Sequence, residues 1–202
     1  MMRIRGRKQR KELSAAIEQG QRLLAAQQEQ EAIEFLDEAV LQFPDNAEIR
    51  VLYASILLAT RPDDVAAEAA KAVELGPNDP VILVRAGHLL LGRGDRKAAR
   101  SCAARANELV QPDFVLMSGL LNLEGLLAAV DGRDDLAEEK LRAAVESDPS
   151  FAASAVDFAK FLAGRARQAE ALEVIDDALE HAKQKVELER LRSGIVGDGA
   201  SS

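Results

Sequence analysis

The sequence of 202 residues is 48% hydrophobic and 30% charged but only 3% aromatic, has no tryptophan, and carries a net charge of −8. Alanine, leucine, glutamate and the basic residues favour helices, whereas strand-favouring residues are few, so the composition argues against a sheet-based fold. Because the acidic excess repels nucleic acid and anionic membranes, it also argues against either as a general partner.

The basic residues gather at the N-terminus, where residues 1–11 contain six lysines and arginines and no acid. The remainder of the chain therefore has a net charge of −14. We expect residues 1–12 to form a basic N-terminal arm, a kind of segment that is more often solvated than functional. These charges stand where a signal peptide needs its apolar segment, no run of about 18 apolar residues follows, and the single Cys102 cannot form an internal disulfide. These features predict a cytoplasmic protein without membrane insertion.

Four prolines mark regular breaks along the chain. Pro44, Pro77, Pro112 and Pro149 stand 33, 35 and 37 residues apart, in the segments QFPDN, GPNDP, VQPDF and SDPSF. Proline lacks the amide hydrogen that a helix needs and pushes the preceding residue out of the helical region. Four helix breaks at nearly constant spacing indicate a repeated unit.

The segments between the breaks share one apolar pattern. Before each break, apolar residues fall at i, i+4 and i+7, as in Ala99, Ala103 and Ala106, which makes one stripe on a helix. A second helix upstream has a small residue followed by an apolar residue at i+3. The small residues are Gly20, Ala54, Gly87, Gly125 and Ala159, each 11 or 12 residues before the stripe. Because glycine inside a helix costs about 1 kcal/mol relative to alanine, we expect these positions to lie where two antiparallel helices approach closely.

Residues 80–113, PVILVRAGHLLLGRGDRKAARSCAARANELVQPD, resemble the tetratricopeptide repeat, a helix–turn–helix unit of about 34 residues. They contain the small residue Gly87, the turn Gly94–Asp95, the alanines Ala99 and Ala106, and a closing proline. The resemblance extends over about residues 13–185. It implies an all-α, right-handed α-solenoid of about five helix–turn–helix repeats.

The repeats are expected at about residues 13–46, 47–79, 80–113, 114–151 and 152–185. The interval from Ala99 to Ala137 is 38 residues, four more than the period of the repeat. We therefore expect an extra turn at the start of a helix that begins near Phe114. A last repeat would otherwise expose an apolar face, so residues 186–202 are expected to form a polar capping helix and a disordered tail that includes the final GDGASS. In that helix Val186, Leu188 and Leu191 are expected to cover the fifth repeat.

The sequence offers little chemistry for catalysis. It has two histidines, His88 and His181, and one cysteine, Cys102, and it contains no HExxH, CxxC or phosphate-binding glycine loop. Cys102 lies beside the stripe residue Ala103 and is expected to be structural, because no base accompanies it. We therefore expect no enzyme, no cofactor, no metal and no small-molecule substrate.

The resemblance implies that the first helix of each repeat lines an inner surface that receives peptides. Counting from each small residue gives the candidate peptide- or partner-binding residues. They are Ile17, Gln21, Val51, Ser55, Val84, Arg85, His88, Asn122, Leu126, Val156 and Lys160. Most of them are aliphatic, so a groove that grips a C-terminal carboxylate is disfavoured, and the same aliphatic residues could equally be part of the core.

The sequence therefore predicts a non-catalytic protein–protein interaction module, such as an adaptor, assembly factor or chaperone-like protein, that holds a peptide or partner helix in a largely aliphatic concave groove. The alternative is a nucleic-acid-associated protein that uses the basic N-terminal arm. The acidic body and the scarcity of aromatic residues for base stacking argue against this alternative.

Overall fold

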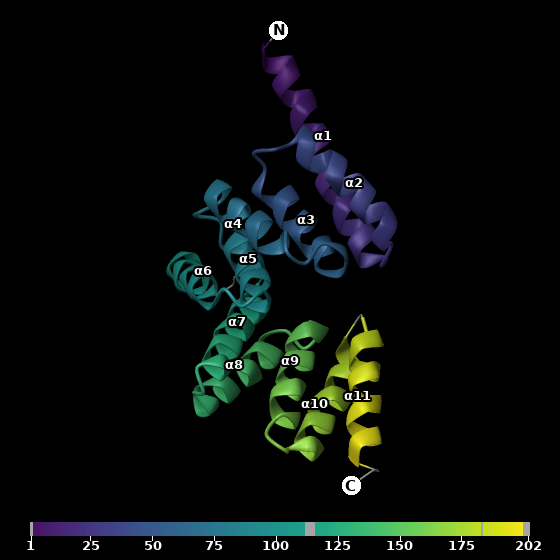
Figure 1. Cartoon of the computed structure of the whole chain (residues 1–202), viewed down its shortest axis with the longest axis vertical. Coiled ribbons are helices and arrows are strands. Elements are labelled where there is room, and N and C mark those ends of the chain that lie inside the picture. Colours follow the sequence, from purple (N-terminus) through teal and green to yellow (C-terminus); the bar gives the residue numbers. More distant parts are fainter. Residues whose placement is uncertain (1, 112–115, 183, 200–202) are drawn as a thin grey trace. The chain divides into compact units, whose positions relative to one another are not determined.

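A computed structural model describes residues 2–111, 116–182 and 184–199, and its side chains are described from residue 11 onward to 197. Within these ranges the chain forms eleven α-helices and no strand (Figure 1). The helices are α1 (Met2–Ala25), α2 (Glu29–Gln42), α3 (Ala47–Thr60), α4 (Val65–Leu75), α5 (Pro80–Gly92), α6 (Arg96–Leu109), α7 (Met117–Val130), α8 (Asp134–Ser147), α9 (Ala152–Ala163), α10 (Gln168–His181) and α11 (Val186–Gly199).

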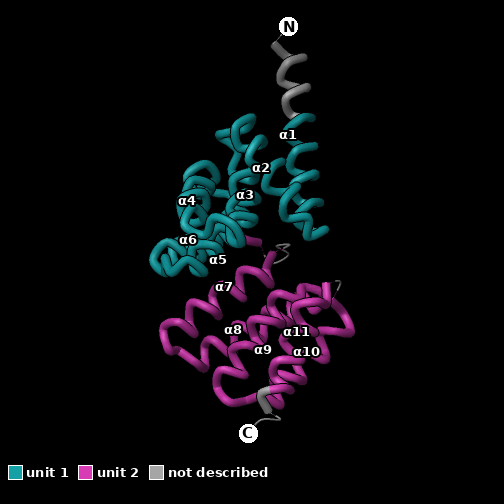
Figure 2. The backbone as a smooth tube through the Cα atoms, turned by 45° about the vertical axis from the view of Figure 1, so that its right-hand side comes forward, with its two compact units in different colours: residues 1–109 teal, residues 110–202 magenta. Residues whose placement is uncertain are grey.

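The helices divide between two compact units, residues 1–109 and 110–202 (Figure 2). In the first unit α1 pairs with α2, α3 with α4, and α5 with α6, and each later pair places its first helix against both helices of the preceding pair. The second unit repeats this arrangement, with α7 paired to α8, α9 paired to α10, and α9 packed on both α7 and α8. The fold is therefore an all-α solenoid of helix pairs, as the sequence predicts.

The proline-containing breaks end one helix and begin the next. Asp79 is the N-cap of α5, and its carboxylate accepts hydrogen bonds from the amides of Val81 (2.9 Å) and Ile82 (3.3 Å), while Pro80 occupies the first helical turn. Asn46 caps α3 in the same way by accepting from the amide of Ile49 at 2.8 Å. These side chains satisfy amides that have no partner inside the helix, which fixes where the first helix of the next pair begins.

The turns inside the pairs depend on glycine at two places. Gly94 between α5 and α6 has φ of +85°, and Gly132 between α7 and α8 has φ of +73°. A residue with a Cβ is strained in this left-handed region, whereas glycine is not. Both glycines end a first helix so that the second helix can fold back along it.

The stripe and the small residues meet at the centre of each pair. Every stripe residue of α2, α4, α6, α8 and α10 is buried, and so are the five small residues of the first helices. A Cβ built on Gly20 of α1 would lie 3.0 Å from Cδ2 of Leu36 on α2, so the leucine would have to shift to admit a larger residue. The burial of all five positions agrees with the close approach that the sequence predicts, and the contact at Gly20 confirms it for the first pair.

Two expectations at the repeat ends are wrong. Helix α7 begins at Met117 and has 14 residues, the same length as α3. The long interval from Ala99 to Ala137 therefore does not lengthen this helix. Phe114 lies outside the described residues. Helix α11 continues through Gly199, so the first part of the final GDGASS is helical and not disordered, and residues 200–202 lie outside the described part.

Helix α11 packs on α9 and α10, just as α9 packs on α7 and α8. Its Leu188 is fully buried and Ile195 is nearly so, and both belong to the core of the second unit. Val186 does not join them as expected, because it is 57% exposed. Helix α11 therefore takes the position of the first helix of a further pair and covers the apolar side of α9 and α10.

Candidate functional site

The first helices of successive pairs stand next to one another within each unit. In residues 1–109 this row consists of α1, α3 and α5, and in residues 110–202 it consists of α7, α9 and α11. We call the solvent-facing side of each row its inner-helix surface. The predicted binding residues lie on these rows, and the structure divides them into buried and accessible sets.

Four of the predicted residues are buried and cannot meet a ligand in this conformation. Val51, Val84, Asn122 and Val156 are each 1–2% exposed. The small residues let neighbouring helices approach so closely that a side chain one turn away is covered by the adjacent pair. For these four residues the structure supports packing, the alternative that the sequence left open.

Seven predicted residues keep an accessible surface. Gln21 and Lys160 are exposed, and Ile17, Ser55, Arg85, His88 and Leu126 are partly buried. Two polar members connect neighbouring helices: the amide of Gln21 donates to Glu48 of α3 at 3.0 Å, and the ammonium of Lys160 lies 3.1 Å from the carboxylate of Glu187 on α11. The hydroxyl of Ser55 donates to the backbone carbonyl of Val51 at 2.9 Å.

Arg85 differs from the other charged residues of its row. It is partly buried on α5, and its guanidinium forms no ion pair or hydrogen bond with any other described residue. His88 follows one turn later on the same face and is also partly buried. Removing a cation from water without a carboxylate partner costs free energy. An ion pair with an anionic ligand would therefore stabilise Arg85 more than it would a fully solvated arginine.

On the row of the second unit, Asn122 and Asp157 form a polar pair. The side-chain amide of Asn122 on α7 donates to the carboxylate of Asp157 on α9 at 2.7 Å. The carbonyl oxygen of the same Asn122 is buried and has no hydrogen-bond partner among the described residues. An unsatisfied buried acceptor costs about 1–3 kcal/mol, so Asn122 contributes less to the stability of the core than the leucines around it.

A cleft that the sequence did not indicate lies between the second helices α4 and α6. It has a volume of about 580 Å³, its floor includes Leu83, Leu90 and Cys102, and Arg105 stands at its rim. The guanidinium of Arg105 closes one side by donating to Asn78 at 2.5 Å. Burial, followed by the negative charge of Asp95, raises the pKa of Cys102 to about 11, so the thiol stays protonated at neutral pH. This cleft depends on the spacing of two helices that are distant in sequence, for which no local signal exists.

Ion pairs connect several of the helix pairs at their surfaces. Arg167, which precedes α10, contacts Glu138 of α8 with both terminal nitrogens, the longer contact being 3.0 Å, and Arg142 contacts the same carboxylate at 2.9 Å. Arg167 and then Arg142 hold the pKa of Glu138 at about 2, below its ordinary value of 4.5. These contacts connect α8 with the start of α10, and the carboxylate of Glu138 is neutralised by both arginines.

The described residues hold no group of three or more histidine, cysteine or acidic side chains that could bind a metal ion. None of the described helices combines the length and the apolar character that crossing a membrane requires.

Neither the protein-family models nor the curated proteins give a significant match to the sequence. Solved structures do match. A thermophilic tetratricopeptide-repeat protein of Thermus thermophilus, TTC0263, superposes with a TM-score of 0.71 at 21% identity, over 91% of this chain and 98% of that one. PilW, a type IV pilus biogenesis factor, gives 0.66 at 16% identity over 92% and 86% of the two chains. PilF of Pseudomonas aeruginosa gives 0.64 at 16% identity over 95% and 90%.

These likenesses cover nearly the whole chain and agree with the helix pairs, the buried stripes and the close approach at the small residues. The chain therefore has the fold of tetratricopeptide-repeat proteins.

Proposed function

We propose that the chain is a non-catalytic protein–protein interaction module, and that the inner-helix surface of residues 1–109 holds an extended peptide or a partner helix. Interaction through such surfaces is general for this fold, and the sequence offers no nucleophile–base pair that would favour a competing chemistry. A role as an adaptor or assembly factor requires this surface to bind the partner.

Arg85 is the observation that carries the proposal. A partly buried arginine without a carboxylate partner in the described chain attracts an acidic group strongly, because the surrounding helices shield the pair from water. Ser55 of α3 occupies the position that His88 occupies on α5, one residue after the small residue, and the two helices are in contact. Equivalent positions on the two contacting helices therefore carry polar side chains.

Apolar surface accompanies these groups. Leu58 of α3, one turn beyond Ser55, is 49% exposed, and Leu91 of α5, one turn beyond His88, is partly buried. A ligand that suits this surface has an acidic side chain for Arg85 and aliphatic side chains for the leucines. An amphipathic segment with that pattern buries apolar area and forms one shielded ion pair.

The experiment is an affinity capture from a cell lysate with the full chain as bait, quantified by mass spectrometry. Three baits are compared: the unchanged chain, Arg85→Glu, and the matched control Arg96→Glu, which makes the same charge change at an exposed position of the second helix α6. We expect a set of proteins that the unchanged chain and the control capture and that Arg85→Glu loses.

Circular dichroism of the three baits establishes that each is folded. If Arg85→Glu captures the same proteins in the same amounts as the control, the inner-helix surface of this unit is not the site. If the captured material is nucleic acid and its recovery depends on the basic N-terminal residues, the chain is a nucleic-acid-associated protein instead.

A further inference from the structure

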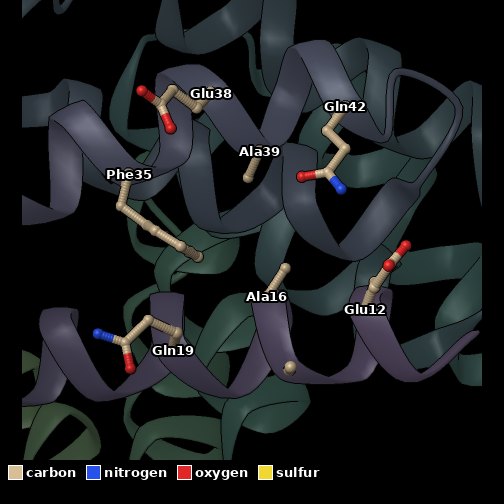
Figure 3. Close-up of a pocket in the computed structure, with 8 residues that line it drawn as sticks. Glu12, Ala16, Gln19, Phe35, Glu38, Ala39 and Gln42 are labelled. Carbon is tan, nitrogen blue, oxygen red and sulfur yellow. The ribbon is translucent and has the colours of Figure 1, made fainter. Parts of the chain in front are cut away.

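The first helix pair carries a surface cleft that the inner-helix surface does not include. Helices α1 and α2 alone line this cleft, which has a volume of about 310 Å³. In Figure 3, Ala16 of α1 and Ala39 of α2 face each other across its middle, and Phe35 and Gln42 of α2 lie toward opposite ends. The small side chains at the middle leave room for another helix to approach closely.

Each later pair in this unit has a preceding pair packed against it. Helix α3 packs on α1 and α2, and α5 packs on α3 and α4, so every described pair after the first in this unit has a preceding pair against it. Helix α1 is the first described helix, and its flank has no such neighbour within the described chain. The cleft is also partly apolar, since Phe35 in its lining is only partly buried.

The charges around the cleft have one sign. Helix α2 contains five acidic residues and no basic residue, and Glu31 and Glu38 are exposed. Glu31, Phe35, Glu38 and Gln42 are spaced i, i+4, i+7 and i+11, so they share the face of α2 that lines the cleft. Neither Glu31 nor Glu38 has an ion-pair partner among the described residues. An occupant of this cleft should therefore be basic.

The same chain supplies a segment of that charge. Residues 3–11 contain six lysines and arginines and no acid. Helix α1 has 24 residues and α2 has 14, and Glu12 already lies beside the last turn of α2 at Gln42, so the backbone of α1 extends past the end of α2 by about ten residues. The backbone that carries the basic segment therefore runs past the end of α2 of its own chain.

We propose that the cleft binds the N-terminal half of α1 from a second copy of the chain, forming a two-fold symmetric dimer through the first helix pair. With the two α1 helices antiparallel and crossing at Ala15 and Ala16, the same patch serves both copies. Residues 3–11 of one copy then run along α2 of the other. Nine helical residues span roughly 14 Å, the length of α2 from Glu29 to Glu38, so the two charged stretches match in extent as well as in sign.

The experiment measures the mass of the full chain by light scattering across a dilution series, together with its circular dichroism. The unchanged chain should have twice the 21.8 kDa mass of one copy at high concentration and dissociate on dilution or in high salt. The double change Glu31→Lys with Glu38→Lys, and separately Lys8→Glu with Lys11→Glu, should each weaken the dimer by about tenfold or more, because each places like charges together.

A mixture of the two charge-reversed chains should recover the dimer mass, because each then offers the other the complementary charge. Recovery on mixing identifies contact between copies, which a change of fold within one copy cannot produce. The matched control, Glu173→Lys with Glu180→Lys, makes the same charge change at exposed positions of α10 and should leave the dimer unchanged.

The proposal is overturned if the unchanged chain remains a monomer up to about 100 µM, a weaker association than most specific pairs show. It is also overturned if the charge-reversed pairs dimerise as well as the control, or if mixing them fails to recover the dimer. A monomer whose residues 3–11 instead bind RNA in a salt-sensitive way would assign the basic segment to nucleic acid.

Discussion

Gly125 of α7 and Leu141 of α8 approach so closely that a side chain on the glycine has no space. A Cβ at position 125 would lie 2.7 Å from Cγ, 2.9 Å from Cδ2 and 3.1 Å from the backbone nitrogen of Leu141. Because the backbone of α8 is one of the three obstacles, rotation of the leucine alone cannot relieve the overlap. We expect Gly125→Ala to lower the free energy of unfolding by about 1–3 kcal/mol, measured by urea denaturation.

Gly194 provides the matched control for this prediction. It lies inside α11, and a Cβ at this position would meet nothing within 4 Å. Gly194→Ala should therefore raise the free energy of unfolding by as much as about 1 kcal/mol, because alanine is the better helix former. If both substitutions stabilise the protein, α7 and α8 do not approach as closely as described.

The sequence predicts much of this fold because its signals are local. Prolines end helices wherever they occur, and the small residue and the stripe recur at one spacing, so Gly125 could be assigned to a helix crossing without coordinates. The start of α7 at Met117 could not be assigned, since nothing local distinguishes an extra helical turn from a longer connection.

The accessible residues of the candidate site were harder to predict than the fold. Val84 and Arg85 are adjacent and were both expected on the groove, yet Val84 is 2% exposed and Arg85 remains partly accessible. Their difference depends on how closely the next pair packs, which is a long-range property. The cleft between α4 and α6 is undetectable in the sequence for the same reason.

Glu138 should make the free energy of unfolding depend on pH in the acid range. Its pKa is about 2 in the folded protein, and its ordinary value of 4.5 applies once the contacts to Arg167 and Arg142 are lost. The folded state therefore binds fewer protons, and the stabilisation is complete above pH 4.5 and lost as the pH falls toward 2. Because both partners are partly solvated, we expect Glu138→Gln to cost only about 1 kcal/mol at neutral pH.

The measurement is urea unfolding of Glu138→Gln and of the unchanged chain from about pH 2 to neutral pH. The difference between them should shrink as the pH falls through this window. Glu139→Gln, an exposed neighbour on α8 without an ion-pair partner in the described structure, is the control and should show no such difference. A gap between Glu138→Gln and the unchanged chain that is constant with pH would contradict the assignment.

Cys102 should react slowly with thiol reagents while the protein is folded. The thiol is 3% exposed and its pKa is about 11, so roughly one thousandth of it is thiolate at about pH 8, whereas an ordinary cysteine is about a quarter thiolate. We expect modification by a chromogenic disulfide to be at least about a hundredfold slower than for free cysteine, and to become fast in urea. Rapid modification of the folded chain would show that the cleft between α4 and α6 exposes its floor.

Contact between Arg85 on α5 and the partner is tested most directly by titration calorimetry with a purified partner from the affinity capture. The chains to compare are the unchanged protein, Arg85→Glu and the control Arg96→Glu, with thermal melts of each. We expect Arg85→Glu to bind about tenfold or more weakly, with a melting temperature equal to that of the control, because the residue has no ion pair in the described chain to lose. Equal affinity of all three chains for the partner would contradict the account.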